Sequence, residues 1–158
     1  MDKTKKTTGR RFTAQHLEYQ KIAENVEYKP VSRNKLSKLA YRLSHIDLIS
    51  RAESSVLSTL LEITPDKAFK KGGVPIIFKS NKDIGFMTRS PGRVSVLLSS
   101  LYDCGLIVIW DFGYFGRQHI DDNDRYTRST RAIDLRLFII RYYELKEKVD
   151  KKLKRIAS

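Results

Sequence analysis

The chain has 158 residues, of which 41% are hydrophobic and 31% charged, so it can bury one substantial core and is too apolar for a disordered polypeptide. Its 31 Lys and Arg against 18 Asp and Glu give a net charge of +13, which favours a polyanionic partner, chiefly nucleic acid. The single cysteine excludes an internal disulfide framework and a cysteine-based zinc site, and no apolar run approaches the ~18 residues of a membrane span.

The N-terminal half is predicted to be a basic arm followed by helices. Residues 1–12 contain few apolar side chains and predict a flexible arm. A weak helical pattern over 13–28 ends before Pro30, and a helix capped by Ser32 carries one apolar stripe through Leu36, Leu39, Leu43 and Ile46. A further helix starts at or near Ser54 and ends before Pro65, and a basic loop covers 66–73.

The C-terminal half alternates short strands and helices. An apolar run predicts an edge strand over 74–78, and Ser80 or Asn81 caps a short helix over 81–86. After a turn over 87–89, Ser90 and Pro91 suit the N-cap and first turn of a helix reaching a turn at 104–105, where we expect Cys104 to be buried. Strands follow over 106–110 and 126–135, separated by a loop, and then a helix from near 137 through 145 and a basic helical or frayed tail.

This order predicts a mainly α protein with a small antiparallel β-sheet, in a winged helix-turn-helix arrangement over residues 13–145 with a tail over 146–158. In that fold the second helix of the motif enters the DNA major groove, and the hairpin behind it contacts flanking phosphates. The exposed face of the helix over 90–104 would offer Arg89, Arg93, Ser95, Val96, Ser99 and Ser100. We therefore expect double-stranded DNA as the partner.

The candidate DNA-binding residues lie in four segments. They are Arg10 and Arg11 (with Lys5 and Lys6) in the arm, Ser80, Asn81 and Lys82 at the short helix, Arg89, Ser90, Arg93, Ser95 and Ser99 at the next helix, and Arg117, Arg125, Arg128 and Arg131 in the wing. Base contacts are expected from Arg89 and Arg93, with Ser95 and Ser99 as further candidates, and phosphate contacts from the others.

Several ordered blocks resemble the N-terminal part of the RepC family of bacterial plasmid replication initiators. The blocks are Gly9-Arg10-Arg11, Val56-Leu57 with Leu60-Leu61 and Pro65, residues 77–81 (IFKSN), Ser90-Pro91, Asp103 with Gly105-Leu106-Ile107, and Ile133-Asp134-Leu135. The resemblance covers residues 9–149 and implies a winged helix and origin recognition without catalysis. Ser95 and Val96 stand where the family tends to have paired arginines, and the family's second, C-terminal domain has no counterpart in this sequence. We therefore expect a diverged relative, a short paralogue or an excised domain of a longer initiator.

Other chemistry is weakly represented. Residues 119–124 (HIDDND) are consecutive in one loop and lack the spacing of an EF-hand, which favours a solvated wing tip over a metal site. No phosphate-binding GxxxxGK[ST] motif is present, so we do not expect nucleotide hydrolysis. We expect no enzyme activity, no cofactor and no metal. Apolar positions Leu145, Val149, Leu153 and Ile156 indicate a narrow seam for packing or homodimerisation through the C-terminal helix. We expect a cytoplasmic bacterial protein that does not bind membranes.

Two alternatives remain open at the level of sequence. A transcriptional regulator on the same fold would differ from an initiator only in the location of its DNA target. A protein-interaction module that uses the winged helix as a scaffold is favoured by the low charge of Ser95 and Val96.

Overall fold

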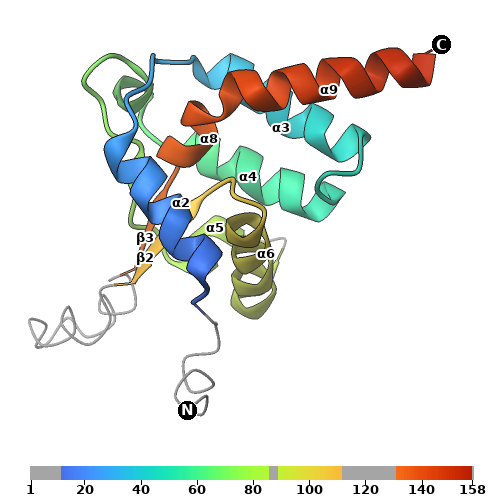
Figure 1. Cartoon of the computed structure of the whole chain (residues 1–158). Helices are drawn as coiled ribbons and strands as arrows, with labels where there is room; N and C mark the ends of the chain where they lie inside the picture. The colour runs from blue at the N-terminus through green and yellow to red at the C-terminus, as the bar shows by residue number, and fades with distance from the viewer. Residues whose placement is uncertain (1–11, 86–88, 112–130, 158) are drawn as a thin grey trace, which may run out of the picture.

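The computed structural model describes residues 12–85, 89–111 and 131–157, and it is mainly helical with a small three-stranded antiparallel sheet (Figure 1). This confirms the coarse fold class expected from the sequence. The elements are α2 (Ala14–Asn25), α3 (Arg33–His45), α4 (Arg51–Ile63), the 3₁₀ helix η1 (Asp66–Phe69), β1 (Ile76–Ile77), α5 (Asn81–Gly85), α6 (Pro91–Asp103), β2 (Val108–Asp111), β3 (Arg131–Asp134), α8 (Arg136–Ile140) and α9 (Tyr142–Ala157).

The helix starts are set by local side-chain caps. Ser32 accepts a hydrogen bond from the Lys35 amide at 3.3 Å, which confirms the predicted cap of α3. The sequence predicts a helix start at or near Ser54, and in the structure this helix starts at Arg51. Ser50 caps α4 there, because its Oγ accepts from the Glu53 amide at 3.0 Å while the Glu53 carboxylate accepts from the Ser50 amide at 2.7 Å.

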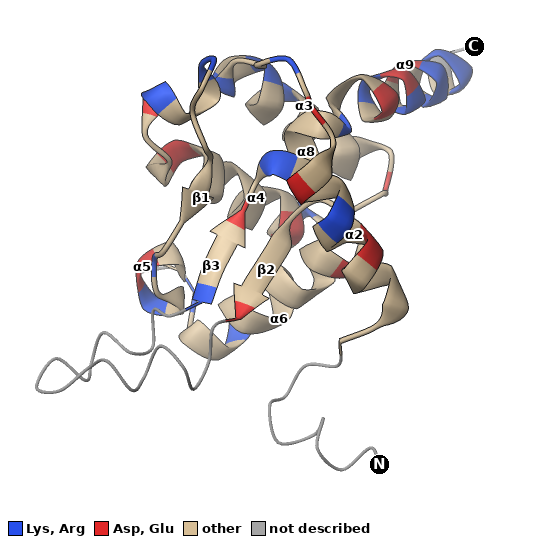
Figure 2. Cartoon of the chain, turned by 60° about the vertical axis from the view of Figure 1, so that its left-hand side comes forward, with Lys and Arg blue, Asp and Glu red and all other residues tan. Residues whose placement is uncertain are grey.

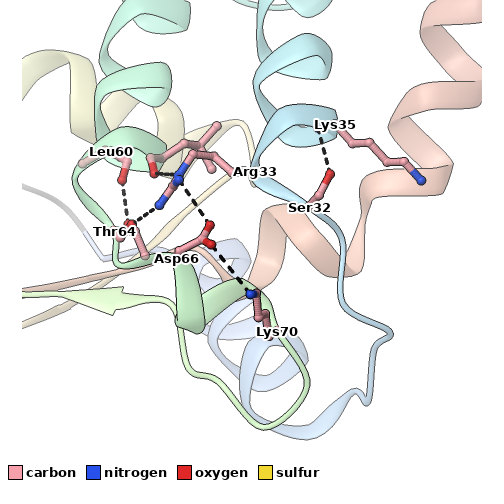
Figure 3. A network of polar contacts seen from close by, with 8 residues as sticks. Ser32, Arg33, Lys35, Leu60, Thr64, Asp66 and Lys70 are labelled. Atoms are coloured by element: carbon pink, nitrogen blue, oxygen red, sulfur yellow. Dashed lines mark hydrogen bonds and ion pairs between the residues drawn. The ribbon is translucent and has the colours of Figure 1, made fainter.

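The C-terminal end of α4 is capped by a side chain from α3 (Figure 3). The Arg33 guanidinium donates to the Leu61 carbonyl at 2.9 Å and to the Thr64 carbonyl at 2.5 Å, and it pairs with Asp66 at 3.3 Å. These bonds satisfy carbonyl groups that have no partner within their own helix. The predicted loop over 66–73 therefore begins as an ordered 3₁₀ turn, η1, held against α3.

The sheet has the order β1-β3-β2, with antiparallel neighbours. Ile76 pairs with Asp134 on one side of β3, and Val108 pairs with the same residue on the other side. β1 is thus an edge strand, as Pro75 beside it predicts, because proline cannot donate to a ladder. Pro75 still contributes its carbonyl, which accepts from the Leu135 amide at 2.9 Å.

The predicted continuous helix from near Leu137 is wrong in one respect, since the chain turns at Arg141 and forms two helices. Leu137, Phe138 and Ile139 are all buried, and three consecutive buried side chains do not fit one stripe of a longer amphipathic helix. The turn reorients the chain so that α9 packs along α3. The seam is buried at Leu145 and Val149, whereas Ile156 is 62% exposed. The expected boundary at residue 146 falls inside α9.

α6 ends in a Schellman motif at the turn predicted from Cys104-Gly105. The Leu106 amide donates to the Leu101 carbonyl, the Gly105 amide donates to the Tyr102 carbonyl, and Gly105 has a φ of +75°. The expectation that Cys104 is buried is wrong, because the motif turns this residue outward and leaves it exposed. Partial burial of its sulfur raises the pKa of the thiol.

Candidate nucleic-acid interface

α5, α6 and the first residue of β3 lie at one end of the molecule (Figure 2). The cations described there are Lys82, Arg89, Arg93 and Arg131. We refer to the surface formed by these four residues together with Ser95 and Val96 as the α5–α6 face.

Asn81 ties three elements of this face together. Its Nδ2 donates to the Pro91 carbonyl at 3.3 Å, and its Oδ1 accepts a short hydrogen bond from the Arg131 guanidinium. The start of α5 is therefore fixed to the start of α6 and to β3. Asn81 and Arg131, both candidate DNA contacts from the sequence, are only partly exposed.

Three further candidates make hydrogen bonds within the protein. Arg89 donates to Ser55 Oγ of α4 at 3.3 Å. The Ser90 hydroxyl accepts from the Arg93 amide at 3.2 Å, which confirms the predicted cap of α6, and the Ser80 hydroxyl accepts from the Asp83 amide at 3.1 Å. The two serines therefore use their hydroxyl groups to start the helices that carry the face.

Lys82 and Arg93 are the cations of the face that are fully available to a ligand. Both are exposed, and neither side chain makes an ion pair with another residue of the described segments. They sit in the first turns of α5 and α6. Gly92 lies next to Arg93, and a Cβ built on it would have no neighbour within 4 Å, so the approach to this helix start is sterically open.

The remaining exposed positions of α6 are small or apolar. Ser95 and Ser99 are partly exposed, and Val96 is 56% exposed. Ser100 is partly exposed, and its hydroxyl donates a short hydrogen bond to Glu53 of α4. The middle of α6 thus presents little charge.

The far end of α6 is held by a contact that sequence reasoning missed. The His16 ring Nδ1 accepts from the Thr13 amide at 3.2 Å, and its Nε2–H donates to Asp103 at 2.7 Å. The buried imidazole also stacks on Tyr102, with ring centroids 4.1 Å apart. Thr13 and His16 form a capping box for α2, and the Thr-x-x-His spacing is the only local signal of it. The contact itself joins residues 87 positions apart.

A buried carboxylate joins β2 and β3, at the opposite end of β3 from Arg131. Asp134 is fully buried, accepts from the Trp110 indole at 2.8 Å, and pairs with Arg136 at 2.8 Å. The hydrogen bond to Asp134 raises the pKa of the Arg136 guanidinium. Burial raises the pKa of the nearby Tyr28 hydroxyl.

Seven candidate residues lie outside the described residues, namely Lys5, Lys6, Arg10, Arg11, Arg117, Arg125 and Arg128. The loop 119–124 lies outside them as well. Within 12–85, 89–111 and 131–157, no three His, Cys, Asp or Glu side chains are grouped to hold a metal ion. No helix in these same ranges is long and apolar enough to cross a membrane.

A comparison with protein families decides the relationship. The family described as "Replication protein C N-terminal domain" matches residues 10–157, essentially the whole chain. The chain belongs to this family. No protein of curated function matches the chain, and no solved structure does. The family assignment confirms the resemblance seen in the sequence blocks, and it associates the chain with replication proteins of the initiator type.

Proposed function

We propose that the chain is a non-catalytic, sequence-specific double-stranded DNA-binding domain of a plasmid replication initiator, and that the α5–α6 face holds the DNA. The observation that carries the proposal is the pair of exposed cations, Lys82 and Arg93, without ion-pair partners among the described residues at adjoining helix starts. Membership of a replication-protein family supports the same partner.

The fold we propose is a winged helix-turn-helix, in which α5 and α6 are the two helices of the motif. The antiparallel order β1-β3-β2, with α5 and α6 between β1 and β2 in the chain, supports this arrangement. The wing would be formed by 112–130, which lie outside the described residues. The basic arm would add phosphate contacts.

In this mechanism the start of α6 enters the major groove. Arg93 reaches a base edge, where a bidentate contact to guanine contributes about 1–3 kcal/mol of discrimination. Lys82 contacts a phosphate as a point charge. Asn81 and Arg131 keep the two helices at a fixed angle, and Gly92 lets the DNA backbone approach the open helix start.

The test is fluorescence-anisotropy binding to a pool of short duplexes across a salt series, with unlabelled competitor. Arg93→Gln should weaken binding to the selected sequence about 5- to 150-fold and leave binding to random duplex nearly unchanged. Lys82→Gln should weaken both equally and reduce the salt slope by about 0.9.

Lys29→Gln is the matched control. Lys29 is exposed in the connection between α2 and α3, and its substitution removes the same charge. If Arg93→Gln and Lys29→Gln have equal effects on the selected sequence, the assignment of Arg93 is refuted. Placing the selected sequences at an origin or at a promoter then separates an initiator from a transcriptional regulator.

A protein-interaction module is the second candidate, and exposed Val96 in the middle of α6 favours it. Apolar side chains at the centre of a contact carry much of the energy of protein–protein interfaces. Weak DNA binding that any competitor abolishes would support this function over DNA recognition.

A further inference from the structure

A second basic surface lies on the side of the molecule away from α6, where α9 packs along α3 (Figure 1). A groove of about 220 Å³ runs between the two helices. Four of its lining residues are cations, Lys35, Lys38, Arg42 and Lys146, and one is an acid, Asp150. We call this feature the α3–α9 groove.

The cations on the α3 side of the groove are uncompensated. α3 carries no acidic residue, and Lys35, Lys38 and Arg42 are exposed and form no ion pair with any other described residue. On the α9 side, Asp150 is already paired with Lys146 at 3.2 Å. The groove therefore presents a net positive charge with three free donors along one wall.

We propose that the α3–α9 groove binds the phosphate backbone of a second DNA segment. This proposal rests on the proposed function, in that a first duplex occupies the α5–α6 face. It adds a second, sequence-independent DNA site, so that one chain would hold two segments of DNA together.

The geometry of α3 suits a nucleic-acid strand. Lys35 and Arg42 are seven positions apart, which places them about 10 Å apart along the helix axis. Phosphates of one DNA strand follow each other about every 3.4 Å along the duplex axis, so the three cations span about three phosphate steps. Tyr142 also lines the groove, but it is only 5% exposed, so the cations of α3 are the groups that a phosphate would meet.

The same groove suits a protein or a membrane poorly. The apolar residues that line it, Leu39 and Val149, are only 3% and 1% exposed, so they are already used in the core. A protein partner would find no apolar anchor there, and a membrane would find no side chain to insert. Positive charge without an accessible apolar contact is the pattern of a phosphate-binding surface.

One straight duplex does not reach both sites. α3 packs on α4 and α4 packs on α6, so α4 separates the groove from the α5–α6 face. With interaxial distances of about 8–10 Å, the two surfaces lie roughly two helix layers apart and face away from each other. The second site therefore takes a separate duplex or a distant part of a looped one.

The experiment measures how many 12-base-pair duplexes each chain binds at saturation, by sedimentation velocity of the full chain with labelled duplex at low salt. The groove variant is Lys35→Gln/Lys38→Gln/Arg42→Gln. The matched control is Lys148→Gln/Lys152→Gln/Arg155→Gln, which removes the same charge from exposed positions of α9. The proposal predicts two duplexes per chain for the wild type and the control, and one for the groove variant.

The salt dependence gives a second readout. In the wild type, three phosphate contacts should give the second binding step a salt slope of about 2.7, and the first step should keep the same salt slope in the groove variant. One duplex per wild-type chain, or equal losses in the groove variant and the control, would overturn the proposal. Displacement of the second duplex by poly-glutamate more readily than by DNA of equal charge would also overturn it, in favour of an acidic protein partner.

Failure of the proposed function is separately visible. Lys82→Gln/Arg93→Gln should weaken the first duplex and abolish its sequence preference, and should leave the second unchanged. If that variant still selects its preferred sequence while the groove variant loses one duplex, the α5–α6 assignment fails and the groove assignment is supported.

Discussion

Loss of Asp134 should strongly destabilise the fold, because it is a fully buried carboxylate with three kinds of donor around it. It accepts from the Trp110 indole at 2.8 Å, from the Arg136 amide at 2.9 Å, and from the Arg136 guanidinium at 2.8 Å. Asp134→Ala leaves the indole and the guanidinium without an acceptor. Removing one partner of a buried ion pair costs about 3–5 kcal/mol.

The expected value lies at the lower end of that range. The Arg136 side chain is 21% exposed, so water can partly solvate the guanidinium once its partner is gone. We therefore expect Asp134→Ala to lower the free energy of unfolding by about 3 kcal/mol, a large part of the ~5–15 kcal/mol typical of a domain. Asp134→Asn should cost less, because it keeps an acceptor and the shape of the side chain.

Urea unfolding followed by circular dichroism measures these differences, and Trp110, the sole tryptophan, adds a local fluorescence signal. Arg136→Ala and the double variant complete a cycle, in which the double variant should cost less than the two single variants combined. A loss below about 1 kcal/mol for Asp134→Ala, at an unchanged urea slope, would refute the view that this carboxylate holds β2, β3 and α8 together.

Three further predictions concern stability. Gly105→Ala should lower the free energy of unfolding by at least about 1–2 kcal/mol, because the φ of +75° is unfavourable for alanine and its Cβ would lie 2.7 Å from Tyr19. Thermal unfolding tests this, and Gly92→Ala is the control because a Cβ there meets no neighbour. Arg33→Ala should lower the free energy of unfolding by about 1–3 kcal/mol, since the last carbonyls of α4 lose their donors; urea unfolding measures this. A loss of stability no larger than that caused by replacing an exposed lysine with alanine would contradict the cap. The Arg141 guanidinium donates a hydrogen bond to Glu144 at 2.9 Å, and this bond lowers the pKa of the Glu144 carboxylate. The contribution of this ion pair to stability is therefore present above the ordinary pKa of 4.5 and is lost as the pH falls through the lowered pKa. The difference in urea midpoint between wild type and Glu144→Gln should therefore shrink as the pH is lowered below 4.5, and a difference that stays constant from pH 7 to pH 3 would contradict the ion pair.

The features that sequence predicted well are those fixed by near neighbours. Ser32 and Ser90 cap their helices through amides three positions away, and Pro75 marks an edge strand because of its own missing donor. The left-handed backbone conformation of Gly105 follows from the helix-to-strand turn in the same way. Each of these signals lies within one turn of the residue that it specifies.

The features that sequence did not predict depend on distant partners. Arg33 caps a helix that ends about 30 positions later, and His16 meets Asp103 across 87 positions. Neither residue type specifies its partner from spacing alone. The position of Cys104, where a helix turns into a strand, predicts a small buried residue, yet the Schellman turn directs it outward.

The long-range contacts that sequence missed also explain how α6 can serve as a rigid element. At its start, Asn81 bonds to Pro91 and to Arg131; in its last two turns, Ser100 bonds to Glu53 and Asp103 to His16. A helix fixed along its length loses little conformational freedom when it binds, so more of the energy of its contacts would appear as affinity. The polar side chains at the two ends of α6 therefore fix its position, while Arg93, which is free of such contacts, is the side chain that can vary its contact with a ligand.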